Sequence, residues 1–338
     1  MQSAGVDIAE PAPMSDIMTI DSASSGRLSF MGALRFSGAD AVSFLQGQVS
    51  NDTQRLTDHT PVLAAYSTAQ GRVLALIYLL PHSSGVVAIL PREILVPTME
   101  RMRKFILRAK VRIEDAADLV VAGQLGGTTP QPRATPQPGA APQAGAISQG
   151  GSKVVSRYVE RDGIGMAPVG HDENRQWIIG PPEKIAAPAD AAAAKHIEEQ
   201  WRLADIRAGL PQVYAATSEA FVAQMLNLDL LDGISFTKGC YTGQEIIART
   251  QHLGRIKRRL FRLSLPSGTW KVGQALRLAD GRQGRLTEVI ESAGRTEALA
   301  VLSVEAGAAG GADAPGELLV DAAELPLPYS LLGPHVRE

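Results

Sequence analysis

A low-complexity stretch at residues 126–153 sets the strongest limit on how this chain can fold. It consists almost entirely of Gly, Thr, Pro, Gln, Ala and Ser. Such a composition cannot bury enough apolar surface to offset the entropy lost on ordering, so the stretch is predicted to be disordered. Strand-like apolar segments flank it at 119–122 and 154–159. We therefore interpret it as a surface insertion within one domain and expect no function of it.

The rest of the chain has the composition of an ordinary globular protein. Its 338 residues, 45% hydrophobic and 20% charged, predict two or three domains. The net charge of -2 gives no overall attraction to nucleic acid or membranes, and no apolar run approaches the ~20 residues of a membrane helix. The N-terminus lacks the features of a secretory signal. The single cysteine, Cys240, excludes an internal disulfide and fits a reducing compartment, so a cytoplasmic location is expected.

The spacing of apolar residues predicts both helices and strands, and so an α+β fold. Strands are expected at 28–36, 63–66, 73–80, 85–90, 110–113, 119–122 and 154–159. Helices are expected at 41–49, 95–107, 189–208 and 244–249. Farther along, short strands are expected at 260–263, 275–278, 285–289 and 298–304. Short strands at such regular spacing predict a separate small barrel or sandwich in the C-terminal part.

The segment Lys238-Gly239-Cys240-Tyr241-Thr242-Gly243-Gln244-Glu245 holds the lone cysteine between two glycines. Glycine lets a backbone turn sharply and lets a ligand approach it closely. A lysine and a helix start beside a cysteine both favour its thiolate form, so Cys240 is a candidate reactive thiol. A second interpretation stays open, because free cysteines are often buried and inert. No spacing typical of a metal site and no phosphate-binding glycine loop is present in the sequence.

This motif resembles the signature of the YgfZ-type folate-binding proteins, relatives of the glycine-cleavage T-protein, an aminomethyltransferase. Four further segments, in the same order as in the family, support the resemblance. They are Leu45-Gln46-Gly47-Gln48-Val49-Ser50-Asn51-Asp52, Gln70-Gly71-Arg72-Val73, Arg207-Ala208-Gly209-Leu210-Pro211 and Ile234-Ser235-Phe236. Together they extend the resemblance over residues 28–304, apart from the insertion.

The resemblance implies a three-domain aminomethyltransferase-like fold around a central channel, with a small C-terminal β-barrel. The channel would hold tetrahydrofolate or a one-carbon derivative. The implied function is the assembly or repair of iron–sulfur enzymes, some of which modify tRNA, by a monomer whose partners are those enzymes or assembly factors. The expected divisions are a loose tail at 1–25, a folate-binding domain at 26–60 and 116–250, a second α+β domain at 61–115, and the barrel at 255–335.

The resemblance also marks site residues. Cys240 would be the reactive group, and the residues expected to contact folate are Trp201, Asn51, Asp52, Lys238, Tyr241, Gln244, Glu245 and Arg72. Each has a structural alternative. Trp201 lies on an amphipathic helix, where an aromatic side chain usually packs in the core. Asn51 and Asp52 are typical turn-capping residues, Lys238 suits a solvated loop, and Gln244 and Glu245 suit a first helical turn.

Two other functions remain as alternatives. A one-carbon transferase would need the aspartate pair that follows the glycine turn in the T-protein, but here residues 71–76 read Gly-Arg-Val-Leu-Ala-Leu. An RNA-binding helper of a tRNA-modifying enzyme could use the basic runs at 101–112 and 249–262, neither of which contains an acidic residue. No known RNA-binding motif accompanies these runs, and a run of charge is usually a solvated face.

Overall fold

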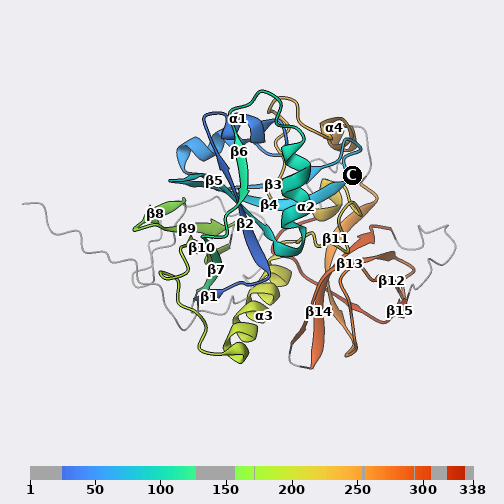
Figure 1. Cartoon of the computed structure of the whole chain (residues 1–338). Helices are drawn as coiled ribbons and strands as arrows, with labels where there is room; N and C mark the ends of the chain where they lie inside the picture. The colour runs from blue at the N-terminus through green and yellow to red at the C-terminus, as the bar shows by residue number, and fades with distance from the viewer. Residues whose placement is uncertain are drawn as a thin grey trace, which may run out of the picture.

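The computed structural model describes residues 25–126, 157–170, 172–252, 256–292, 294–305 and 318–331. The expected loose tail and insertion therefore lie outside the described residues, apart from Ser25 and Gly126. The chain is a mixed α+β protein built on three sheets (Figure 1). Among the helices of the described residues, none is both long and apolar enough to cross a membrane.

The first sheet has the strand order β3-β4-β5-β2-β6 and is antiparallel throughout. Its strands are β2 (Met31–Ser37), β3 (Val62–Ser67), β4 (Val73–His82), β5 (Gly85–Pro91) and β6 (Arg112–Asp115). Helices α1 (Ala41–Gln46) and α2 (Arg92–Arg103) pack on one of its faces, and the 3-10 helix η1 (Thr53–Asp58) contacts α1 and β4. The apolar run 73–80 thus forms a central strand, as its sequence predicts.

The second sheet has the order β1-β7-β10-β9-β8. Its strands are β1 (Ser25–Arg27), β7 (Val120–Leu125), β8 (Val159–Arg161), β9 (Ile164–Val169) and β10 (Asp172–Gly180). Strands that precede and follow residues 127–156 pair within it, β7 with β10. Helix α3 (Ala191–Ala208) begins at Asp190, whose carboxylate caps Ala193 N, and ends at Gly209 in the left-handed region.

The third sheet curls into a half barrel with the order β15-β12-β13-β14-β11-β16. Its strands are β11 (Arg258–Leu265), β12 (Ala275–Leu278), β13 (Gln283–Ser292), β14 (Arg295–Ser303), β15 (Leu318–Val320) and β16 (Ala323–Leu325). The four strands expected from the sequence are all present. The 3-10 helix η2 (Ala223–Leu226) and helix α4 (Gln244–His252) lie in the connection that leads to it from α3.

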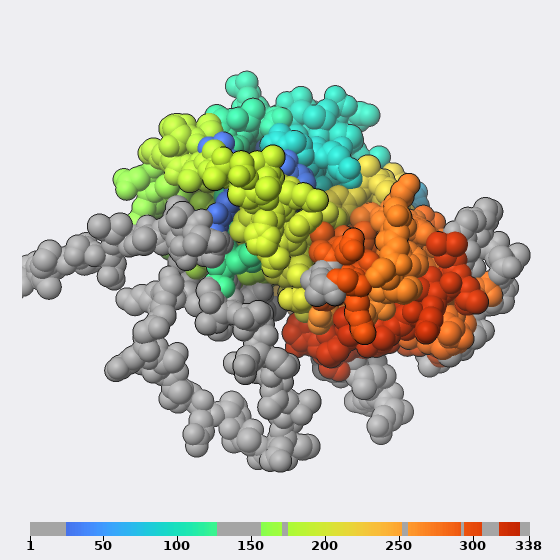
Figure 2. All heavy atoms as spheres, turned by 90° about the horizontal axis from the view of Figure 1, so that it is seen from below, coloured from blue at the N-terminus to red at the C-terminus, as the bar shows by residue number. Residues whose placement is uncertain are grey.

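The three sheets share one apolar core. Its largest cluster contains Val73 and Tyr78 from β4, Trp177 from β10, Trp201 from α3 and Leu260 from β11. Figure 2 shows the third sheet, in orange and red, packed beside the part coloured green to yellow. Strands from 26–60 and from 61–115 lie together in the first sheet, since β2 pairs with both β5 and β6. The expected division into domains stays a prediction.

Two expected helices end earlier than the apolar spacing predicts. The helix expected at 41–49 is α1, Ala41–Gln46. The apolar spacing predicts a helix at 95–107, but α2 spans Arg92–Arg103. Phe105 contributed to that spacing and Leu107 was the expected last residue, yet both are exposed beyond the helix end. A side chain that faces solvent carries no information about a buried face, so the prediction extended the helix too far.

Candidate functional site

The cysteine motif forms a loop that ends at the start of α4, and Lys238 fixes this loop to the N-terminal part of the chain. Its Nζ donates to three backbone oxygens, those of Gln46 (2.7 Å), Val49 (2.7 Å) and Asn51 (2.8 Å). These bonds use all three donors of the ammonium group. They join two segments that the family resemblance singled out separately. In this conformation Lys238 has no donor left for a ligand.

The surroundings of Lys238 also affect its charge. Burial lowers the pKa of Lys238 to about 8, and the nearby carboxylate of Asp52 opposes this shift. The ammonium lies 4.9 Å from the centre of the Tyr241 ring, and Tyr241 itself is buried. Burial raises the pKa of Tyr241 to about 12, so its hydroxyl is neutral at physiological pH. The contacts of Lys238 and Tyr241 thus hold the loop in place on its buried side.

Cys240 points out of this loop. Its side chain is exposed, and it lies four residues before Gln244, the first residue of α4. A methyl group added to the neighbouring Gly239 would meet nothing within 4 Å, so the space around the loop is open on that side. Phe236, two residues before Lys238, is also exposed. The lone thiol is therefore accessible to a partner, and the alternative of a buried, inert cysteine is wrong.

Gly71 lies in the turn between β3 and β4, and this turn packs against Gly243 of the cysteine motif. Both adopt left-handed backbone conformations, with φ of +72° and +84°. A Cβ on Gly243 would lie 2.6 Å from the carbonyl oxygen of Thr68 and 3.1 Å from the Cα of Gly71, so only glycine fits. Arg72 is exposed and donates to the carbonyl of Ala220 (3.0 Å). Beyond it, β4 enters the core with apolar side chains.

Asn51 and Asp52 hold the segment that receives Lys238. Asn51 is buried, and its amide nitrogen donates to the carbonyls of Leu63 (2.9 Å) and Asp232 (2.6 Å). Asp52 caps η1 by accepting from Gln54 N (3.1 Å) and also accepts from the amide of Gln46 (3.0 Å). The capping interpretation is confirmed for Asp52, whereas the amide nitrogen of Asn51 bonds to carbonyls of two distant segments. Gln244 and Glu245 lie in the first turn of α4, where Glu245 is exposed.

Trp201 lies in a buried polar cluster between the sheets. Its ring contacts Gly123, packs 4.7 Å from the ring of Trp177, and has the guanidinium of Arg175 5.1 Å from its centre. Arg175 forms a buried ion pair with Asp205 (2.7 Å). With its ring covered by protein, Trp201 is a core residue, but this does not test a contact with folate.

The same cluster contains buried polar atoms without a hydrogen-bond partner. They are the Nε1 atoms of Trp177 and Trp201 and the hydroxyl of Tyr78; elsewhere, both amide atoms of buried Gln212 also have no partner. Burial, and next the charge of Asp205, raises the pKa of Tyr78, which stays a neutral donor. Unpaired buried polar groups are costly, so native proteins usually supply them with a ligand or water. Donors and acceptors of this kind fit the polar edges of a pterin ring.

A hollow of about 520 Å³ opens where elements of the three sheets meet. Its walls include Phe30, Glu93 from α2, Lys195 and Arg202 from α3, Tyr214, and Val272 before β12. The buried carboxylate of Glu288, on β13, pairs with Arg202 and accepts from the hydroxyl of Tyr214 (2.6 Å). Burial, followed by the charge of Glu288, raises the pKa of Tyr214. Sequence analysis missed these three residues, because their contacts span 74 and 86 positions of the chain and no local pattern marks them.

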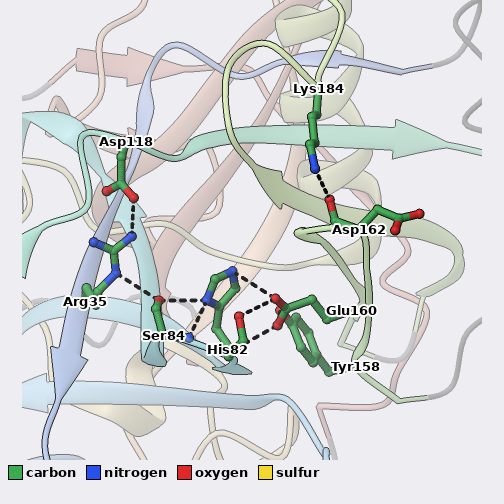
Figure 3. Close-up of polar contacts among 9 residues, drawn as sticks. Arg35, His82, Ser84, Asp118, Tyr158, Glu160, Asp162 and Lys184 are labelled. Atoms are coloured by element: carbon green, nitrogen blue, oxygen red, sulfur yellow. Dashed lines mark hydrogen bonds and ion pairs between the residues drawn. The ribbon is translucent and has the colours of Figure 1, made fainter.

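A second hollow, of about 590 Å³, lies between the β4–β5 turn and β8. Figure 3 shows its polar contacts, in which Glu160 from β8 accepts from Tyr158 (3.0 Å) and lies 3.7 Å from His82 Nε2. Arg35 lies between Ser84 (2.9 Å) and Asp118 (2.6 Å). Most polar groups of this cluster are paired with one another, although the buried Nε2 of His82 has no hydrogen-bond partner closer than the 3.7 Å approach of Glu160, and the contacts join the two sheets. No group of three or more potential metal ligands occurs among the described residues.

No family model matches this chain. The tRNA-modifying protein YgfZ of Yersinia pestis is 32% identical over 303 residues, which are 87% of this chain and 88% of that protein. Its namesake from Colwellia psychrerythraea is 32% identical over 238 residues, 70% of each chain. Among solved structures, the glycine cleavage system aminomethyltransferase T of Bartonella henselae matches 83% of this chain and 79% of its own, with 13% identity and a TM-score of 0.49. Since the identity to YgfZ extends over most of both chains, this chain belongs to the YgfZ family.

Proposed function

We propose that this chain is a cytoplasmic, monomeric folate-binding protein that supports the assembly or repair of iron–sulfur enzymes, among them enzymes that modify tRNA. The observation that carries the folate part is the group of buried donors and acceptors without partners beside the hollow at the junction of the sheets. The accessible thiol of Cys240, on a loop fixed by Lys238, supports the second part. The name of the YgfZ relatives supports the connection with tRNA modification.

The interior cluster would hold the pterin ring of tetrahydrofolate. Trp201 and Trp177 would donate through Nε1, and Tyr78 and Gln212 would offer a hydroxyl and an amide. Because protein covers its ring, Trp201 would contribute a hydrogen bond and no stacking. At the hollow, Lys195 and Arg202, the latter paired with Glu288, would face the carboxylates of the folate tail. When bound, a reduced folate supplies the capacity to carry a one-carbon unit.

The motif would act at the protein surface. Cys240 would ligate an iron ion or exchange with a disulfide, both of which need an accessible thiolate. Gln244 and Glu245, at the start of α4, are the polar side chains of the motif proposed to contact a ligand beside it. Asn51, Asp52, Lys238 and Tyr241 would keep this loop in place, and Arg72 would hold the adjoining turn.

Folate binding can be tested by titrating the purified protein with tetrahydrofolate and following tryptophan fluorescence. Trp201→Phe keeps an aromatic ring but removes the Nε1 donor, so affinity should fall about tenfold, the value of one hydrogen bond. Trp270→Phe is the matched control, because the Nε1 of Trp270 already donates to Pro266 O. Absence of saturable binding to the unmodified protein would refute the folate proposal.

The role of the thiol can be tested separately with Cys240→Ala. The side chain is exposed, so the variant should fold and unfold like the parent. Support of iron–sulfur enzymes should be lost, measured as activity of a tRNA-modifying iron–sulfur enzyme in cells that lack the native protein. Full support by the variant would contradict a role for Cys240.

A folate-dependent transferase remains the alternative proposal. Production of methylene-tetrahydrofolate from an amine donor would favour it. The residues that follow Gly71 speak against it, since Val73, Ala75 and Leu76 are fully buried and carry no group that can move a proton.

A further inference from the structure

Helix α2 ends in an exposed basic segment, residues 104–112, called here the α2–β6 loop. It reads Lys-Phe-Ile-Leu-Arg-Ala-Lys-Val-Arg and contains no acidic residue. Phe105 is 45% exposed and Leu107 88% exposed, which places two large apolar side chains in solvent among the cations. Lys104, Arg108 and Lys110 are exposed as well, and none of the three side chains forms an ion pair among the described residues.

The loop is held firmly despite this exposure. Arg103 donates through Nε to the carbonyl of Ile113 (3.0 Å), which closes the loop at its base. At its far side, the backbone nitrogen of Lys110 donates to the carboxylate of Asp40 (2.6 Å). Ile106, Ala109 and Val111 pack against the core of the first sheet. The inward side chains thus anchor the loop, while Phe105 and Leu107 point outward from a fixed backbone.

Cations around an exposed aromatic ring match the chemistry of a single-stranded nucleic acid. Phosphates pair with Lys and Arg, and bases stack on aromatic rings. A protein partner fits less well, because the centres of protein–protein interfaces are depleted in lysine, whereas here the unpaired cations outnumber the exposed apolar side chains. We propose that the α2–β6 loop binds single-stranded RNA, with Lys104, Arg108 and Lys110 on the phosphates and Phe105 under a base.

The position of the α2–β6 loop relates this binding to the cysteine motif. The α2–β6 loop packs on the same apolar cluster as Val49, whose carbonyl accepts from Lys238 of the cysteine motif. Figure 1 shows the C-terminal end of α2 and helix α4 toward the same end of the molecule. An RNA strand on the loop would therefore lie toward the end of the molecule where α4 lies (Figure 1).

The test measures binding of a fluorescently labelled oligouridine to the full chain by anisotropy, over a range of salt concentrations and without folate. The variant Lys104→Gln/Arg108→Gln/Lys110→Gln should bind at least tenfold more weakly. The slope of log affinity against log salt should become shallower by about 2, at about 0.7 for each lost phosphate contact. Phe105→Ala should lower the affinity by about tenfold, the value of one stacked base, with the slope unchanged.

The matched control removes the same charge outside both basic runs, with Lys271→Gln/Arg285→Gln/Arg295→Gln in and near the third sheet, all exposed positions. It should retain the affinity of the parent. Equal losses of affinity in both triple variants would show that binding depends only on the overall charge of the protein, and would overturn the proposal. So would displacement of the RNA by poly-glutamate at an equal concentration of charge, which would assign the loop to an acidic protein. Because folate is absent from the assay, failure here leaves the proposed function untouched.

Discussion

Two glycines of the cysteine motif show how differently one residue type can be used. Gly243 has φ +84°, and a Cβ there would collide with the carbonyl of Thr68. Gly239, four residues earlier, has open space where a Cβ would point. The first is required by the packing of two turns. The fold does not require a glycine at position 239. Any requirement for this glycine would come from a ligand or partner that approaches Cys240.

Alanine substitutions separate these two uses. Gly243→Ala should lower the free energy of unfolding by about 2 kcal/mol or more, because it adds a left-handed alanine and a steric clash. Gly239→Ala should change it by less than about 0.5 kcal/mol. Urea unfolding of both variants checks this. Equal effects of the two substitutions would show that the turns do not pack as described.

The importance of single residues in this motif could be predicted from the sequence, but their contacts could not. The resemblance marked Lys238 and Asn51 as members of one site. That Nζ of Lys238 bonds the carbonyls of residues 46, 49 and 51 follows from tertiary structure alone, since nothing in the local sequence distinguishes one carbonyl from another. Trp201 was expected at a ligand. Its ring is buried against Gly123, a contact between α3 and β7 that depends on tertiary structure.

At the scale of elements, long helices and strands with a clear apolar pattern could be located from the sequence, whereas the shortest strands could not. Helix α3 and strand β4 carry long, regular apolar patterns and lie where expected. Strands β15 and β16 have three residues each, too few to show a period. β15 pairs in parallel with β12, about forty positions earlier, a partnership that local sequence does not encode.

The contact between the β4–β5 turn and β8 should depend on pH. The side chain of His82 is 7% exposed, and its burial, with the charge of Arg35 in support, lowers its pKa; Glu160 and Asp118 oppose the shift. As the pH falls through about 6.5, the unfolded chain therefore takes up a proton that folded His82 resists. The free energy of unfolding should decrease between pH 7.5 and 5.5, by no more than about 1.4 kcal/mol per pH unit from this residue.

Urea unfolding of the parent and of His82→Gln at both pH values tests this expectation. The variant has no imidazole to titrate, so it should lose less stability on acidification than the parent. If both proteins lose the same amount, His82 is not the group responsible, and the acid sensitivity comes from other titratable groups.

At the scale of the whole molecule, buried polar contacts attach the third sheet to the rest. Arg259, on β11, forms two bonds to the carboxylate of Asp229, at 2.6 and 2.9 Å. Asn227 donates to the carbonyl of Leu260 (2.9 Å), on the same strand. These contacts fix the third sheet against the connection from which α4 and the cysteine motif emerge, so the sheet stabilises the proposed site without contributing to its thiol.

Removing the cation should show how strong this attachment is. Arg259→Met leaves Asp229 buried without its partner, which should cost about 3–5 kcal/mol of the free energy of unfolding. The control is Arg258→Met, a neighbouring exposed arginine, which should cost less than about 0.5 kcal/mol. Guanidinium unfolding followed by circular dichroism compares the two. Similar values would show that the ion pair does not hold the sheet.

The bonds made by Lys238 also set an order of events during synthesis. The three carbonyls that accept from it precede it by 187 to 192 residues. At about 5–20 residues per second, a ribosome needs about 10–40 s to make that stretch. For this time residues 46–51 exist without the group that fixes them. The N-terminal part of the chain should therefore stay incomplete until the cysteine motif has been translated, and a fragment that ends before residue 238 should not acquire the native structure at that edge.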